Sequence, residues 1–127
     1  MDMRTPLGRS RGLGSTNDGV HHWWMQRLTG IALIPLTLWF VYSAVKMSGA
    51  SHAEFTTWAT THGNPILLIL LIITMFHHGQ LGLQVVVEDY IHSEGTKMFL
   101  LIAIKFAAIF FGASAIFAVL RLTFGGS

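Results

Sequence analysis

Residues 66–90 read ILLILLIITMFHHGQLGLQVVVEDY, the strongest structural signal in the chain. The first half of this segment is as apolar as a lipid tail, and the second half adds polar residues without a break in helical character. A helix rises about 1.5 Å per residue, so the segment is long enough to cross a hydrocarbon core of about 30 Å. Polar groups inside a spanning helix are costly, so they usually face a bundle interior and carry function. The sequence therefore predicts a transmembrane helix with a functional polar side.

The polar residues of this predicted helix fall on two stripes, because successive residues turn by about 100°. His78 lies near mid-membrane, and Gly82 lies one turn further along and removes a side chain there. A histidine beside a cleared surface suits a flat macrocycle, so one interpretation is that His78 ligates haem. The alternative is that His78 only hydrogen-bonds to a neighbouring helix and Gly82 only permits close packing. One stripe holds His78, Gly82, Val85 and Asp89, the other holds His77, Gln84 and Glu88, and the opposite, lipid-facing side holds Phe76, Leu83 and Val87.

The composition is that of an integral membrane protein. The 127 residues are 52% hydrophobic and 11% charged, and the mean hydropathy is +0.56, which favours membrane spans over a soluble domain. The chain has no cysteine, so it forms no disulfide and ligates no thiolate-bound iron–sulfur cluster. The formal net charge of +2 is too small to indicate nucleic-acid binding.

We expect an all-α fold with three transmembrane helices, at about 25–46, 66–90 and 97–122. Together they would form a single membrane domain over residues 21–127. Residues 1–20 are polar and contain four glycines, which argues against regular helix and predicts an irregular cytoplasmic arm.

The remaining segments are expected to connect or to pack these spans. Residues 47–64 should form a short polar connection, and the two histidines in it, His52 and His62, are a weak signal for a metal site. In the third span, small residues recur at spacings that let neighbouring backbones approach closely. These residues are Ala103, Ala107, Ala108, Gly112, Ala115 and Ala118.

The basic residues predict the orientation of the chain. With the N-terminus in the cytoplasm, the start of the first span and the end of the second share the cytoplasmic face. Arg27 can then approach Asp89 and Tyr90, about 16 Å along the helix axis from His78. The cytoplasmic side would hold Arg4, Arg9, Arg11, Arg27 and Lys97, and the opposite side Lys46 and Arg121.

These polar residues form a pattern that resembles a known family, the hydrophobic membrane anchor subunits of succinate dehydrogenase (respiratory complex II). The resemblance covers all three spans. The sequences HHWWMQR, residues 21–27, and HHGQLGLQVVVEDY, residues 77–90, look particularly like the alphaproteobacterial and mitochondrial branch. The pattern is His21-x5-Arg27 followed by His78-x3-Gly82-x6-Asp89-Tyr90.

The resemblance implies that the chain helps to bind haem b. The histidine that matches His78 is an axial ligand of the iron, and the other ligand is expected from a second membrane subunit, a cytochrome b subunit. His77 is the neighbouring alternative, but the family's spacing to Asp-Tyr and the stripe shared with Gly82 both select His78. Two histidine ligands leave the iron no open position, which suits electron transfer.

The resemblance also implies a ubiquinone-reduction site at the end of the second span. The tyrosine that matches Tyr90 donates a hydrogen bond to ubiquinone, and Asp89 beside it can help to supply protons. Arg27 is implied to lie near the haem propionates and the quinone pocket, with His21 in the same cofactor-binding set. Electrons would come from a flavoprotein subunit that oxidises succinate, through an iron–sulfur subunit, at the bacterial inner membrane.

Three alternatives stay open on the sequence alone. A purely structural anchor would use the same spans to dock soluble subunits. A quinol:fumarate reductase would run the reaction in the opposite direction. A small proton-linked transporter is suggested by His77, Gln84 and Glu88, but three spans would transport only as an oligomer, and the sequence shows no inverted repeat.

Overall fold

The computed structural model describes residues 13–125, and this part of the chain forms four helices and no strand. The helices are α2 (Leu13–Lys46), α3 (His52–Thr60), α4 (Asn64–Tyr90) and α5 (Glu94–Phe124). Three of them, α2, α4 and α5, are long and apolar enough to cross a membrane. The predicted all-α fold with three apolar spans is confirmed.

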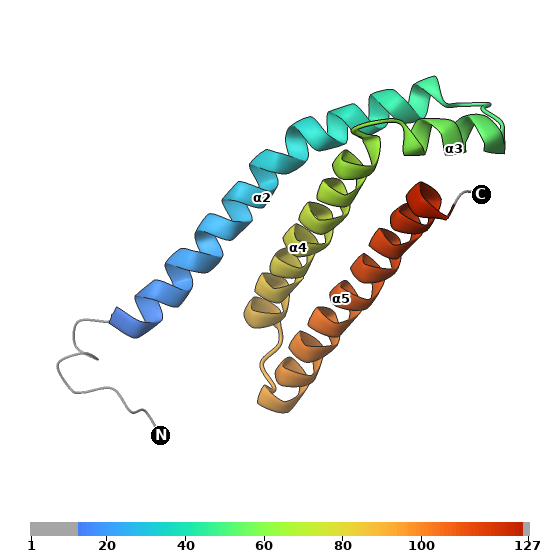
Figure 1. Ribbon diagram of the computed structural model, residues 1–127. Coiled ribbons are helices and arrows are strands. Elements are labelled where there is room, and N and C mark those ends of the chain that lie inside the picture. The colour runs from blue at the N-terminus through green and yellow to red at the C-terminus, as the bar shows by residue number, and fades with distance from the viewer. Residues whose placement is uncertain (1–12, 126–127) are drawn as a thin grey trace.

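Helix α4 is the centre of the structure, because it lies between α2 and α5 and packs against both (Figure 1). Within the described residues, α2 and α5 do not pack against each other. The short helix α3 packs against α4 and α5, at the end where α4 begins and α5 finishes (Figure 1). The polar half of α4 therefore lies towards the opposite end of the molecule from α3.

The ends of α4 follow from local sequence. Gly63 precedes the helix with a φ of 93°, a left-handed conformation that glycine adopts without strain. Pro65 lies in the first turn, where the missing N–H has no helical partner to lose. At Ile91 the backbone becomes extended, with φ −100° and ψ 121°. The observed helix thus begins two residues before the predicted span, at Asn64, and ends where predicted.

The start of α2 differs from the sequence prediction. We expected an irregular arm through residue 20, but residues 13–20 form the first two turns of α2. A glycine costs a helix about 1 kcal/mol relative to alanine, but such propensities are a weak guide that structural context overrides, and extending an existing helix needs no new nucleus. The rest of the predicted arm, residues 1–12, lies outside the described residues, together with Arg4, Arg9 and Arg11.

The connection between the first two spans contains helix α3, which the sequence analysis missed. A capping box begins this helix: the Ser51 hydroxyl accepts the Glu54 backbone N–H at 3.2 Å, and the Glu54 carboxylate accepts the Ser51 N–H at 2.9 Å. These two bonds satisfy N–H groups that have no partner inside the helix. The Ser-x-x-Glu spacing was a readable signal for this helix.

Two residues assigned to the lipid-facing side of α4 are instead covered by the rest of the chain. Phe76 packs on α5, where a Cβ added to Gly112 would lie 3.6 Å from the Phe76 ring. Val87 is buried, whereas Leu83 is exposed as expected. Helical periodicity separates the sides of a helix but does not say which neighbour covers each side, so this part of the prediction was wrong. Of the predicted small packing residues, Gly112 is the buried one.

The contact between Gly112 and Phe76 predicts a size limit at position 112. Gly112→Ala should be tolerated, because its methyl group would meet Phe76 at 3.6 Å, an ordinary van der Waals distance. Gly112→Leu should destabilise the packing of α4 on α5 by roughly 1–3 kcal/mol, the usual cost of overpacking. Thermal-shift midpoints of the detergent-solubilised protein with its partners measure this difference, and equal midpoints for the two variants would contradict the packing.

The outer sides of α2 and α5 expose many large apolar side chains. Such a surface is unusual for a water-soluble chain, and it fits contact with lipid or with other membrane helices. Prominent members are Ile31, Ile34, Leu38 and Val45 on α2, and Phe99, Phe106, Ile109 and Phe117 on α5.

Candidate functional site

His78 lies on the side of α4 that packs against α2. Its ring nitrogen Nδ1 is 3.0 Å from the hydroxyl oxygen of Thr29 on α2. Thr29 is buried, and its hydroxyl also lies 2.7 Å from the backbone carbonyl oxygen of Met25, one turn earlier in the same helix. The other ring nitrogen of His78, Nε2, makes no hydrogen bond to any of residues 19–125, the part of the chain whose side chains the structure describes. The histidine is therefore held through one nitrogen and leaves the other free.

Glycines on both helices shape the space around His78. A Cβ added to Gly30 of α2 would lie 3.5 Å from His78 Cε1, so the ring lies directly against the α2 backbone. On α4, a Cβ added to Gly82 would lie 3.8 Å from Nε2 of Gln26. The Gln26 side chain thus covers the surface beside Gly82, which favours the close-packing interpretation of that glycine. A role for Gly82 towards a cofactor stays a prediction.

Helix α2 presents a row of polar side chains to α4 that the sequence analysis did not identify. His22, Gln26 and Thr29 recur at spacings of four and three, which places them on one helical side. Among the described residues, His22 Nε2 and Gln26 Oε1 are buried without a hydrogen-bond partner. Unpaired buried polar atoms are uncommon and costly. This row therefore forms a polar strip in the otherwise apolar interface between α2 and α4. The repeat of polar residues within an apolar span was the signal that could have found it.

The residues predicted at the membrane interface lie on α2 and α4, with Arg27 near the middle of α2 and not at its end. Asp89 and Tyr90 end α4 and are both exposed, with 74% of Tyr90 accessible. The guanidinium carbon of Arg27 lies 4.9 Å from the ring centre of Trp23, a cation–π contact within α2. His21 is exposed. Because Arg27 rests on its own helix, its approach to Asp89 and Tyr90 stays a prediction.

His77 faces a different neighbour from His78. Together with Gln80 and Lys105 it lines a cavity of about 460 Å³ between α4 and α5. Adjacent helical residues point about 100° apart, and here that separation sends His78 to α2 and His77 to α5. The two histidines can therefore be distinguished by their surroundings as well as by their spacing to Asp89 and Tyr90.

A hydrogen-bonded ladder extends along α4 from the level of His77 towards the end of the helix. Gln80 Nε2 donates to Gln84 Oε1 at 3.2 Å, and Gln84 Nε2 donates to Glu88 Oε1 at 3.0 Å. Side-chain pairs at this spacing stabilise a helix by about 0.2–0.5 kcal/mol each. The ladder gives a local structural reason for Gln84 and Glu88, two of the three residues that suggested a proton-linked transporter.

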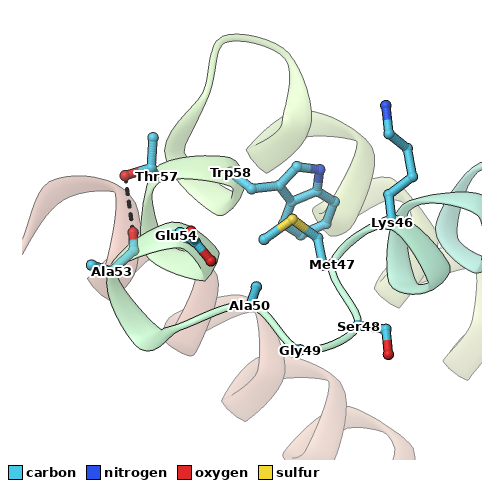
Figure 2. Close-up of a pocket in the computed structure, with 9 residues that line it drawn as sticks. All are labelled: Lys46, Met47, Ser48, Gly49, Ala50, Ala53, Glu54, Thr57 and Trp58. Carbon is cyan, nitrogen blue, oxygen red and sulfur yellow. Dashed lines mark hydrogen bonds between the residues drawn. The ribbon is translucent and has the colours of Figure 1, made fainter.

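A surface hollow of about 640 Å³ lies at the other end of the molecule (Figure 2). It is formed by the end of α2, the turn that follows and the start of α3, with Lys46 and Trp58 in its lining. It lies at the opposite end of α4 from Tyr90, so it is separate from the predicted site. His52 and His62 are exposed, and among residues 19–125, whose side chains the structure describes, no group of three His, Cys, Asp or Glu residues could hold a metal ion.

Comparison with known proteins agrees with the motif-based resemblance. Residues 1–113 match the family described as succinate dehydrogenase/fumarate reductase transmembrane subunit. A succinate dehydrogenase hydrophobic membrane anchor subunit of Rickettsia bellii is 35% identical over 109 residues, covering 85% of this chain and 86% of the relative. The protein of the same name from Paracoccus denitrificans is 27% identical over 124 residues, covering 95% and 93%.

A similar relative occurs in Reclinomonas americana, whose succinate dehydrogenase membrane anchor subunit is 29% identical over 98 residues, covering 74% of this chain and 81% of the relative. No solved structure matches the chain. The family match includes α2 and α4 completely, and with them the His78 and Asp89–Tyr90 motifs. The chain belongs to the family of succinate dehydrogenase and fumarate reductase transmembrane subunits.

Proposed function

We propose that this chain is the hydrophobic membrane-anchor subunit of a succinate dehydrogenase, that it helps to bind haem b, and that it forms part of the ubiquinone-reduction site. The observation that carries the proposal is the arrangement of His78. Its Nδ1 is 3.0 Å from the Thr29 hydroxyl, and its Nε2 has no hydrogen bond within the described chain. A histidine oriented through one nitrogen and free at the other has the usual arrangement of a metal ligand.

The donor set of the chain fits a haem shared with a second subunit. His78 supplies one imidazole at mid-helix, and we propose that the other axial ligand comes from a cytochrome b subunit. When bound between two histidines, a haem b supplies one-electron transfer at an iron without an open coordination position. Arg27 and His21 are exposed at the mouth of the first span. The guanidinium fork of Arg27 is suited to bind carboxylates such as propionates.

The end of α4 offers suitable groups for a quinone. Tyr90 and Asp89 are exposed and make no side-chain hydrogen bond within residues 13–125. The Tyr90 hydroxyl can donate a hydrogen bond to a quinone oxygen and hold the ring in place. Asp89, beside it at the interface, can exchange protons with water and deliver them to the reduced quinone. Binding by Tyr90 and proton transfer by Asp89 together support the reduction of ubiquinone at the end of α4.

The remaining parts of the reaction belong to partner subunits. The sequence contains no cysteine for iron–sulfur ligation. We therefore propose that a flavoprotein subunit oxidises succinate and that an iron–sulfur subunit passes the electrons to the site on this chain. The three apolar helices support a multi-pass membrane protein. We propose that it lies in the bacterial inner membrane.

The distribution of basic residues predicts the orientation in that membrane. The N-terminus and the connection between α4 and α5 should be cytoplasmic, and Ser127 should lie on the periplasmic side. A phosphatase reporter fused after Ser127, active only outside the cytoplasm, should be active, and a fluorescent reporter that matures only in the cytoplasm should be dark there. The reverse pattern would overturn the proposed orientation.

The proposed function is tested on the protein purified with its membrane partners. We expect a reduced-minus-oxidised spectrum typical of haem b, and reduction of ubiquinone when succinate is supplied. A complex that lacks haem and reduces quinone normally would contradict the role of His78. A complex that binds haem and cannot use succinate or ubiquinone would contradict the assignment to succinate dehydrogenase, and activity with fumarate and a quinol alone would favour the reverse reaction.

A further inference from the structure

Thr29 has one hydroxyl hydrogen and three neighbours within hydrogen-bonding distance. Its oxygen lies 2.7 Å from the carbonyl oxygen of Met25, 3.1 Å from that of Gln26, and 3.0 Å from His78 Nδ1. A carbonyl oxygen can only accept a hydrogen bond. Two oxygens approach to 2.7 Å when a hydrogen lies between them. The hydroxyl hydrogen of Thr29 is therefore donated to a backbone carbonyl oxygen of α2. The hydroxyl oxygen then faces His78 as an acceptor.

This arrangement determines which nitrogen of His78 carries the proton. Because the Thr29 oxygen accepts, Nδ1 of His78 must be the N–H that donates. A neutral imidazole has a single N–H, so in the neutral form of His78 the other nitrogen, Nε2, is unprotonated and keeps its lone pair. Only an unprotonated ring nitrogen can bind a metal. Helix α2 thus selects the form of His78 that is ready to bind iron through Nε2.

We propose that Thr29 is a positioning residue for haem b, fixing the tautomer and ring orientation of His78 and raising the electron density at its Nε2. The inference rests on the proposed haem role of His78 and assigns a function to a residue outside the recognised motifs. Thr29 is only 8% exposed, so its bond to His78 is shielded from water, which strengthens it. Gly30 supports the contact, because its missing side chain lets the ring lie against α2.

The hydrogen bond should tune the reduction potential of the haem. Donation from Nδ1 increases electron density at Nε2, which favours ferric over ferrous iron and lowers the potential. Thr29→Val removes the acceptor and keeps the shape of the side chain, so the potential should rise. We expect a three- to tenfold change in the ratio of ferric to ferrous affinity, which converts to an upward shift of about 28–59 mV for one electron.

The test is a redox titration of haem in the purified complex, for the native chain and three variants. Thr29→Val should shift the midpoint potential upward, and Thr29→Ser, which restores the hydroxyl, should return it close to the native value. Thr123→Val is the matched control: the Thr123 hydroxyl donates to the Val119 carbonyl at 2.8 Å, the same local bond, but it has no histidine partner in the described chain. Its potential should equal that of the native complex.

The outcomes separate this inference from the function on which it rests. An unchanged potential in Thr29→Val, with haem still dependent on His78, overturns the role of Thr29 and leaves the proposed function standing. A shift in Thr29→Ser as large as that in Thr29→Val also overturns it, because packing and not the hydroxyl would then be responsible. Retention of haem in His78→Ala would instead contradict the proposed function itself.

A second measurement needs no variant at position 29. In a haem-free preparation of the complex with ¹⁵N-labelled histidine, nitrogen NMR reports which ring nitrogen carries hydrogen. The signals of His78 are assigned by their loss in His78→Gln. We expect a protonated Nδ1 and an unprotonated Nε2, and a protonated Nε2 in the native chain would overturn the inference.

Discussion

Replacing His78 with alanine should remove most of the haem b from the assembled complex, whereas replacing His77 with alanine should leave most of it bound. His78 is held against α2 through Nδ1, with Nε2 free, whereas His77 faces the cavity between α4 and α5. Loss of a residue that merely orients a metal ligand typically lowers metal affinity about 10–100-fold. Loss of the ligand itself should cost at least as much, so we expect haem per complex to fall by about tenfold or more.

The two alanine variants form a matched pair, because the residues are neighbours on one helix and lose the same side chain. Haem is measured from the reduced-minus-oxidised spectrum and normalised to the amount of the other subunits. A normal subunit ratio in His78→Ala shows that the loss is one of binding rather than of assembly. If His77→Ala lost the haem and His78→Ala kept it, the assignment of the ligand would be reversed.

Tyr90→Phe should lower succinate-driven quinone reduction by about tenfold or more. The substitution keeps the ring at the end of α4 and removes the hydrogen bond that we propose Tyr90 donates to the quinone oxygen. A neutral hydrogen bond contributes about 0.5–1.5 kcal/mol, and more is lost if the partner is left buried and unpaired. A tenfold change in rate corresponds to ~1.4 kcal/mol. Succinate oxidation with an artificial acceptor that takes electrons upstream should persist, because we propose that the flavin and the clusters belong to other subunits.

The chain provides a matched control for this substitution in its second tyrosine. Tyr42 is also exposed and lies near the other end of the first span. The Lys46 Nζ lies 5.3 Å from the centre of its ring, a cation–π contact. Tyr42→Phe should leave both activities unchanged. If Tyr90→Phe leaves quinone reduction intact, or lowers both activities in proportion, then Tyr90 serves as an interfacial anchor or an assembly contact.

Asp89→Asn should resemble Tyr90→Phe and should also change the pH profile of quinone reduction. An amide of the same shape cannot exchange protons in the range where a carboxylate can. The profile is measured on the same membranes with the upstream acceptor as reference. A rate loss that is equal at all pH values would show that Asp89 positions the quinone without moving protons.

The strongest sequence prediction was the second span. A long apolar run followed by a polar stripe, with Pro65 before it and Tyr90 at its end, predicted a helix that the structure places at Asn64–Tyr90. Predictions from local pattern succeed here because length, hydropathy and helix ends are properties of one segment. The pairing of His78 with another helix was also one of the two interpretations that the spacing allowed, and it is observed.

What the sequence analysis missed depends on contacts between segments. Phe76 was assigned to lipid because periodicity alone does not reveal that Gly112, on another helix, makes room for it. Thr29 was overlooked because a threonine inside an apolar span looks neutral until its neighbour across the interface is known. Helix α3 is a different case, since its Ser51–Glu54 capping box was visible in the sequence. The relation of Arg27 to Tyr90 stays a prediction.

The central position of α4 has a consequence for biogenesis. Ribosomes synthesise the chain from its N-terminus, so α2 enters the bilayer before its packing partner α4 exists. Until then, His22 and Gln26 face lipid or the insertion machinery, where unpaired polar groups are unfavourable. Because α2 and α5 do not pack together within the described chain, insertion of α5 does not cover the polar side chains of α2 that α4 covers. A ribosome stalled between the first and second spans therefore leaves an intermediate with a polar stripe in the membrane, a natural substrate for membrane chaperones and quality-control proteases.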